Sequence, residues 1–177
     1  MESTVPPSGI ILLLDIPSGC EVGIDMKNWI TPEKFYGIKN VPNGFHMIYI
    51  RTSRDSHLSG LRISYPLLIE DDSILKFQYD QKTEELTKCS VSSEERERIK
   101  ANEELPSMLP EYPKELQRTW LSLSSFVSYE SIKRIFPENM HFYSCDFLQS
   151  VPSNSQDRLA DNYKVPEMEE MEDLKVN

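Results

Sequence analysis

The chain has 177 residues, enough for one domain with a hydrophobic core and further segments outside it. Its formal net charge is −10, from 29 acidic and 19 basic side chains, and no cluster of Lys and Arg stands out. Because an acidic surface repels phosphate groups, this composition argues against direct binding to nucleic acid.

Cysteine usage and hydropathy indicate a soluble protein of a reducing compartment. The three cysteines, Cys20, Cys89 and Cys145, are odd in number, widely spaced and without a CxxC motif. This pattern argues against a disulfide framework and against a zinc site. The apolar run at residues 10–14 is too short to span a bilayer, so we expect a soluble intracellular protein.

Residues 9–80 are expected to form short strands separated by turns. The apolar run at residues 10–16, which the Pro17-Ser18-Gly19 turn follows, is typical of a strand buried on both faces. The alternation in residues 21–25 predicts a second strand, with Glu21 and Asp25 on its solvent face. Further strands are expected at residues 35–38, 45–50, 61–70 and 74–79, with a turn at residues 41–44. Strands at this spacing favour a sandwich or a barrel.

The sequence changes to a helical pattern after residue 91. Ser92, followed by Glu95 three residues later, is the signature of a capping box. Pro113 fits the first position of a second helix, and Ser128 fits the N-cap of a third. In the second helix three apolar side chains share one face: Leu116, Trp120 and Leu123.

These elements predict a β-rich α+β fold, with a sandwich or barrel-like β unit and a few short helices packed at one end. We assign this N-terminal domain to residues 1–151. Residues 152–177 contain seven acidic and three basic side chains and few apolar ones. Such a segment buries too little apolar surface to offset the entropy of ordering, so we expect a flexible acidic linker or tail.

The polar residues of this chain show no catalytic pattern. His46 has no metal-ligand spacing around it, and we interpret its ring as a structural group that satisfies a neighbouring backbone atom. Cys20 has no adjacent base, so it is expected to be an inert small residue. The sequence therefore predicts no catalytic, cofactor or metal site and no enzyme. The alternative is a small β-rich module that binds a ligand or hydrolyses it with His46, Cys20 or Asp25.

The two tryptophans carry the largest apolar surfaces. Trp120 is expected in the core because of its helical spacing, whereas Trp29 lies in a less regular segment.

Two blocks of residues resemble the a1-cistron splicing factor family. The first block reads G-x-E-x-G-I-D, then Trp29, then K-F-x-G-I-K-x-x-P-x-G-x-H. Its matching residues are Gly19, Glu21, Gly23, Ile24, Asp25, Trp29, Lys34, Phe35, Gly37, Lys39, Pro42, Gly44 and His46. The second block contains Tyr112, Pro113, Trp120, Leu121, Ser122, Leu123 and Phe126, followed by Pro137, Glu138 and Asn139. We interpret the Gly, Pro and aromatic residues of these blocks as mostly structural.

The resemblance implies that this is the N-terminal domain of an assembly factor of the U5 small nuclear ribonucleoprotein (snRNP). The resemblance also implies a partner, because members of the family bind the large U5 core protein, pre-mRNA-processing-splicing factor 8. They contact the RNase H-like and Jab/MPN-like domains of that protein. The resemblance further implies no catalytic activity, no cofactor, and a location in the cytoplasm and the nucleus. The helical C-terminal domain of the family is expected to be absent from this sequence. A generic interaction module outside splicing is a further alternative.

Overall fold

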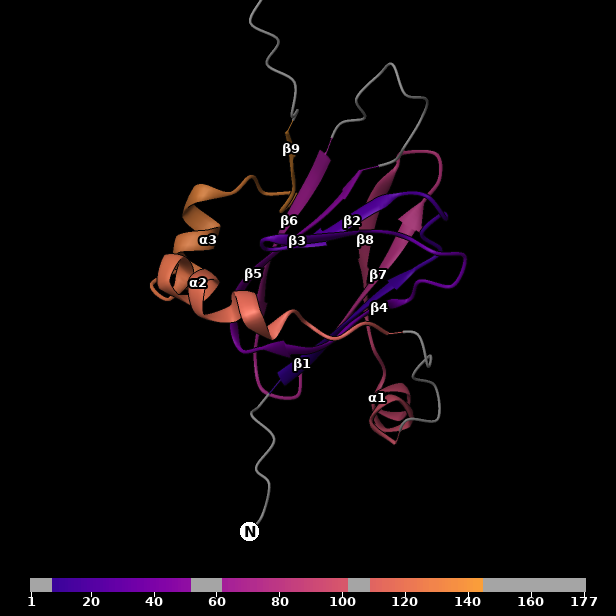
Figure 1. Ribbon diagram of the computed structural model, residues 1–177, viewed down its shortest axis with the longest axis horizontal. Helices are drawn as coiled ribbons and strands as arrows, with labels where there is room; N and C mark the ends of the chain where they lie inside the picture. Colours follow the sequence, from indigo (N-terminus) through magenta and orange to yellow (C-terminus); the bar gives the residue numbers. More distant parts are fainter. Residues whose placement is uncertain (1–7, 52–61, 102–108, 145–177) are drawn as a thin grey trace, which may run out of the picture. The chain divides into compact units, whose positions relative to one another are not determined.

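The β-rich α+β fold is confirmed by the computed structural model, which describes residues 8–51, 62–101 and 109–144. In this part of the chain, two sheets run in the orders β4-β1-β7-β8 and β3-β2-β5-β6-β9 (Figure 1). The chain divides into two compact units, Met1–Phe147 and Leu148–Asn177, and every described residue belongs to the first. The expected acidic segment at residues 152–177 lies outside the described residues.

The described residues contain nine strands, divided between the two sheets, and three helices. The four-stranded sheet contains β1 (Ser8–Leu14), β4 (Gly37–Pro42), β7 (Ile74–Asp80) and β8 (Glu85–Cys89). The five-stranded sheet contains β2 (Glu21–Ile24), β3 (Lys27–Ile30), β5 (Gly44–Arg51), β6 (Arg62–Ile69) and β9 (Phe142–Ser144). The helices are α1 (Ser93–Lys100), α2 (Lys114–Ser124) and α3 (Tyr129–Ile135).

Strand β1 lies inside the four-stranded sheet, antiparallel to β4 and parallel to β7. Its side chains are buried on both faces, as the apolar run predicts. Ile11 and Leu13 pack into the main core, whereas Leu12 belongs to a second cluster that includes Ile99 of α1. The helix α1 therefore covers the outer face of this sheet.

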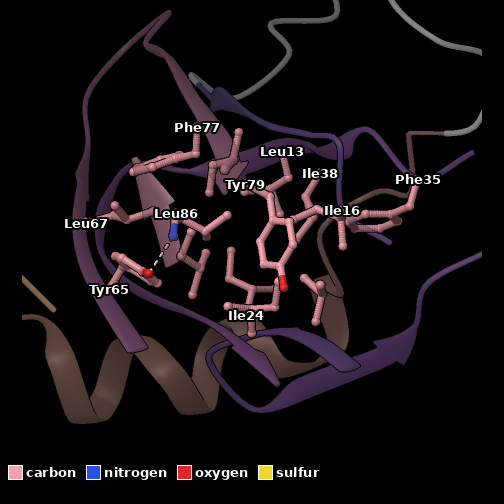
Figure 2. Packing of buried hydrophobic residues seen from close by; sticks show 14 of the residues in the cluster. Leu13, Ile16, Ile24, Phe35, Ile38, Tyr65, Leu67, Phe77, Tyr79 and Leu86 are labelled. Carbon is pink, nitrogen blue, oxygen red and sulfur yellow. Dashed lines mark hydrogen bonds between the residues drawn. The ribbon is translucent and has the colours of Figure 1, made fainter. Parts of the chain in front are cut away.

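The main core fills the space between the two sheets. It contains inward-facing side chains of β1, β4 and β7 from one sheet and of β2, β5 and β6 from the other (Figure 2). Tyr65 crosses this layer, and its hydroxyl accepts a hydrogen bond of 2.7 Å from the backbone N–H of Leu86. Burial raises the pKa of Tyr65 to about 12, although the hydrogen bond from Leu86 acts in the opposite direction.

The chain passes from one sheet to the other between β4 and β5. The strand expected at residues 35–38 begins later, at Gly37, and continues to Pro42. Of the turn expected at residues 41–44, only Asn43 therefore lies between β4 and β5. Gly37, the first residue of β4, has φ of +135°, a backbone conformation that favours glycine. Phe35 precedes the strand, and its side chain is buried in the main core.

The helices begin largely where the sequence predicts. The Oγ of Ser92 accepts a hydrogen bond from the backbone N–H of Glu95, and Ser128 caps α3 in the same way. Pro113 is the N-cap of α2 rather than its first helical residue, because its ψ of 92° is still extended. The sequence places the helices together at one end of the β unit. In the structure, α1 covers the four-stranded sheet, whereas α2 lies against β5 of the five-stranded sheet.

Candidate functional site

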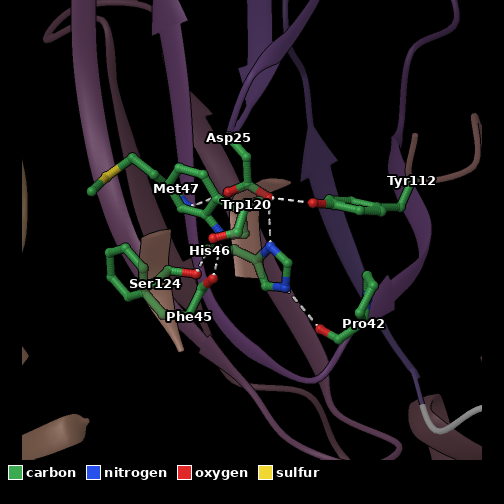
Figure 3. Close-up of polar contacts among 8 residues, drawn as sticks. All are labelled: Asp25, Pro42, Phe45, His46, Met47, Tyr112, Trp120 and Ser124. Carbon is green, nitrogen blue, oxygen red and sulfur yellow. Dashed lines mark hydrogen bonds and ion pairs between the residues drawn. The ribbon is translucent and has the colours of Figure 1, made fainter. Parts of the chain in front are cut away.

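A buried polar cluster lies between the two sheets and joins four segments of the chain. Asp25 follows β2 in the turn before β3, and its carboxylate is 1% exposed. Its Oδ1 accepts a hydrogen bond of 2.9 Å from the backbone N–H of Met47. Its Oδ2 lies 2.7 Å from Nδ1 of His46 and 2.7 Å from the hydroxyl of Tyr112 (Figure 3). The carboxylate is thus surrounded by three hydrogen-bond donors.

His46 lies on the inner face of β5, the same face as Ile48 and Ile50. Its Nε2 is 2.8 Å from the carbonyl oxygen of Pro42, while Nδ1 faces Asp25. Each ring nitrogen therefore lies within hydrogen-bond distance of an oxygen atom. The histidine therefore links the end of β4 to the turn after β2. Its interpretation as a structural group that satisfies a backbone atom agrees with this geometry.

Tyr112 reaches the cluster from the segment before α2. This segment runs along β4, because the N–H of Lys39 donates to the carbonyl of Pro110 and the N–H of Tyr112 donates to the carbonyl of Lys39. The ring of Tyr112 is 2% exposed and meets the ring of His46 edge-on at 5.3 Å. Burial raises the pKa of Tyr112 well above its usual value, and the hydrogen bond to Asp25 raises it further.

The cluster has the composition of a catalytic site but not the geometry of one. In a catalytic site, one nitrogen of the histidine ring contacts the nucleophile, but Nε2 of His46 contacts the carbonyl of Pro42 instead. The side chains of His46 and Asp25 are also no more than 2% exposed. Cys20 is also buried. Within the described ranges, no group of three His, Cys, Asp or Glu residues could hold a metal ion. The arrangement fixes four backbone segments relative to one another.

Both carboxylates expected on the solvent face of β2 are buried, so that expectation is wrong. Glu21 is 7% exposed and accepts a hydrogen bond of 2.7 Å from Asn28. It also pairs with Arg51 of β5 and lies 3.5 Å from Arg62 of β6. Burial raises the pKa of Glu21, but the hydrogen bonds from Asn28 and Arg51 and the two guanidinium charges outweigh it, so the pKa is lowered.

The glycines of the first block are explained by close contacts and by backbone conformation. A Cβ on Gly23 would lie 2.1 Å from the ring of Tyr49, and a Cβ on Gly37 would lie 1.9 Å from the backbone oxygen of Ile11. Gly19 and Gly44 have φ of +81° and +120°, with open space at the Cβ position. These residues serve the fold.

The two tryptophans occupy different layers. Trp29 of β3 packs against the main core and is partly buried. Trp120 of α2 lies on the other side of β5: its ring stacks on Phe45 with centroids 6.0 Å apart, and its Nε1–H donates to the carbonyl of Phe45 at 2.6 Å. The second block thus attaches α2 to the outer face of the five-stranded sheet.

The apolar face that Leu116, Trp120 and Leu123 share on α2 is only partly covered. Leu123 is 71% exposed, and the neighbouring Ser124 is buried instead. Phe126, in the turn between α2 and α3, is 94% exposed, and Ile135 at the end of α3 is 71% exposed. The sequence pattern alone does not show this, because helical spacing identifies the apolar residues without showing how much of that face the sheet covers.

One signal in the sequence could have located the polar cluster. His46 has the same parity as Ile48 and Ile50 along β5, which places it on the core face of the strand. A polar ring on that face needs buried hydrogen-bond partners, and Asp25 and the carbonyl of Pro42 supply one each. Asp25 becomes a partner of His46 because β2 pairs with β5. Alternation within a single strand does not reveal that pairing.

Comparisons with known proteins agree with the resemblance found in the sequence. The family model for the AAR2 N-terminal domain matches residues 7–137. The AAR2 homologs of Macaca fascicularis and Homo sapiens are 28% and 27% identical over 159 residues, which is 86% of this chain and 41% of each relative. The AAR2 homolog of Caenorhabditis elegans is 31% identical over 128 residues, which is 72% of this chain and 34% of the relative.

The matched region contains the strands β1 to β8 and the three helices of the described residues, and it ends before β9. The chain spans about two fifths of the length of its mammalian relatives. No helix in the described part of the chain is long and apolar enough to cross a membrane. On the strength of the family match, this chain belongs to the AAR2 family and corresponds to its N-terminal domain.

Proposed function

We propose that this domain acts in a non-enzymatic assembly factor for pre-mRNA splicing. In this role it binds the large U5 snRNP core protein, pre-mRNA-processing-splicing factor 8, during U5 biogenesis, in the cytoplasm and then in the nucleus. The observation that carries the proposal is the family match over residues 7–137. It is supported by the two sequence blocks of this chain that resemble a family of U5 assembly factors.

The distribution of polar and apolar groups supports binding rather than catalysis. The Asp25, His46 and Tyr112 side chains are buried and use their hydrogen bonds on one another and on backbone atoms. Large apolar side chains are instead exposed on α2 and α3, where a partner could reach them. A rigid scaffold with exposed apolar side chains has the properties of a protein-binding module.

The proposal is tested by titrating this chain, in a calorimeter, with the purified RNase H-like domain of the large U5 protein, and separately with its Jab/MPN-like domain. We expect saturable binding to the RNase H-like domain with a stoichiometry of one. A β-rich protein of similar size and net charge serves as the control and should show no heat of binding. If neither this chain nor a longer family member containing this domain bound either U5 domain, the proposed function would be wrong.

A further inference from the structure

At the end of α2 and in the turn that follows it, a polar side chain is buried and large apolar side chains are exposed. Ser124 is 6% exposed, and its Oγ donates a hydrogen bond of 2.8 Å to the carbonyl of Trp120. The adjacent Leu123 is 71% exposed, and Phe126 is 94% exposed. Single exposed apolar residues are ordinary on protein surfaces, but a buried serine beside an exposed leucine and phenylalanine needs an explanation.

The exposed side chains are close in sequence and are carried by two adjacent helices (Figure 1). Successive members of the set Leu123, Phe126 and Tyr129 are three residues apart around the turn, so the Cα atoms of each successive pair lie within about 11 Å. Tyr129 is 52% exposed, Ile135 71% and Leu121 36%. We call these five residues the α2–α3 apolar surface: Leu121, Leu123, Phe126, Tyr129 and Ile135.

The charges around this surface are opposite in sign to the charge of the whole chain. Residues 114–135 carry four basic and two acidic side chains, whereas the full sequence has 19 basic and 29 acidic ones. Lys133 lies directly at the surface, with its Nζ 4.7 Å from the centre of the Tyr129 ring, and Arg134 beside it is exposed. Lys133 and Arg134 outnumber the single exposed carboxylate of α3, Glu130, so this end of the surface favours a partner with carboxylates beside an apolar patch.

Other exposed apolar side chains in the described residues form smaller groups. Met26 directly precedes β3 and Ile30 is its last residue, at the edge of the five-stranded sheet, and they are 50% and 67% exposed. Tyr143 is 52% exposed, but its hydroxyl is bound to Glu85. Met26 and Ile30 therefore provide matched controls of similar exposure outside α2 and α3.

We propose that the α2–α3 apolar surface is where this domain docks a partner protein whose surface presents apolar side chains with carboxylates beside them. The inference rests on the proposed function, since it assigns the contact with the U5 protein to this face and to this chemistry. Phe126 is the main anchor, because it is the more exposed of the two aromatic side chains in the set and has the larger area to bury on binding.

The test compares two double variants with the unmodified chain by calorimetric titration against the RNase H-like domain. Replacing Leu123→Ser and Phe126→Ser together should weaken binding at least about thirtyfold and make the heat-capacity change of binding less negative. The control pair Met26→Ser and Ile30→Ser should change the affinity by less than about twofold. All four residues are exposed, so melting temperatures should stay close to that of the unmodified chain.

A second pair of variants tests the charge of the partner without removing apolar area. Lys133→Glu with Arg134→Glu should weaken binding about fivefold at low salt, and the difference from the unmodified chain should shrink as salt rises. Lys88→Glu on β8, an exposed residue of the other sheet, is the control.

The possible results separate this inference from the proposed function. If the unmodified chain binds and the Leu123/Phe126 and Lys133/Arg134 variants bind equally well, the docking site is elsewhere, while the proposed function stands. If the unmodified chain does not bind but a longer family member does, the inference is overturned while the proposed function stands; if neither binds, both are wrong. If the Leu123/Phe126 variant abolishes a homodimer but not the binding of the U5 domain, the surface serves a second copy and the inference is overturned.

Discussion

Removing the hydroxyl of Tyr112 tests whether the buried polar cluster stabilises this fold. The substitution Tyr112→Phe leaves the ring in place, including its edge-on contact with His46, and deletes only the hydrogen bond of 2.7 Å to Asp25. A hydrogen bond to a charged group contributes about 1.5–3 kcal/mol. Because Asp25 keeps its donors from His46 and Met47, we expect a loss near the middle of this range.

The assay is urea denaturation followed by tryptophan fluorescence, for which Trp29 and Trp120 are natural reporters. We expect Tyr112→Phe to lower the free energy of unfolding by about 2 kcal/mol, with an unchanged m-value, and the melting temperature by about 4–8 °C. The control is Tyr129→Phe on the exposed side of α3, which should change the free energy of unfolding by less than about 0.5 kcal/mol.

A double-mutant cycle with Asp25→Asn assigns the effect to the bond itself. If Tyr112→Phe cost less than about 0.5 kcal/mol, or if the two substitutions were additive, the cluster would not stabilise the fold in the way described here. A changed m-value would show that the variant alters the denatured state instead.

The same variant has a distinct signature at high pH. Burial and the neighbouring carboxylate raise the pKa of Tyr112 above the value of 10 that it has in the unfolded chain. Above pH 10 the unfolded chain therefore loses a proton that the folded chain keeps, and stability falls by about 1.4 kcal/mol per pH unit. Tyr65, whose pKa is raised to about 12, adds a similar slope. Tyr112→Phe should remove about half of the combined alkaline slope between pH 10 and 12.

Three further substitutions test other parts of the fold. Gly37→Ala should cost more than about 3 kcal/mol by denaturation, because its Cβ would meet the backbone oxygen of Ile11 at a φ of +135°, whereas Gly19→Ala, with open space, should cost about 1 kcal/mol. Glu21→Gln should remove part of the acid sensitivity: the lowered pKa means that Glu21 stabilises the fold above about pH 4.5, and this contribution is lost as the pH falls through the folded-state pKa. An unchanged acid profile would contradict this assignment. Ser92→Ala should weaken the start of α1 by about 1 kcal/mol, seen as faster amide exchange in residues 93–100; equal exchange rates would refute the capping role.

The strands of this domain were predictable wherever one apolar pattern determined them. The run in β1 indicates burial on both faces, and the structure provides one cluster for each face. The start of α1 was predictable because the Ser92–Glu95 capping box is local. Strands β3, β8 and β9 were not predicted, since their polar residues carry weak patterns and their pairing depends on neighbours far away in the sequence.

The solvent-face prediction for Glu21 and Asp25 failed for a physical reason. Alternation shows that Val22 and Ile24 share a face, but it assigns the other face to solvent only when nothing covers it. Here the residues at both positions have partners from distant strands: Arg51 and Arg62 pair with Glu21, and the segment before α2 brings a donor to Asp25. Buried charges depend on tertiary partners, which a single sequence pattern does not contain.

The buried cluster and the exposed α2–α3 surface should respond to substitution in opposite ways. For a domain with about 5 kcal/mol of stability, a loss of 2 kcal/mol still leaves about 99% of the molecules folded. Because apparent affinity falls only with the folded fraction, Tyr112→Phe should leave the affinity for the U5 domain within experimental error. Phe126→Ser, on a side chain that is 94% exposed, should leave stability unchanged and lower the affinity. If Tyr112→Phe lowered the affinity as much as Phe126→Ser while the folded fraction stayed above 95%, the division of this domain into an inner scaffold and an outer binding surface would be refuted.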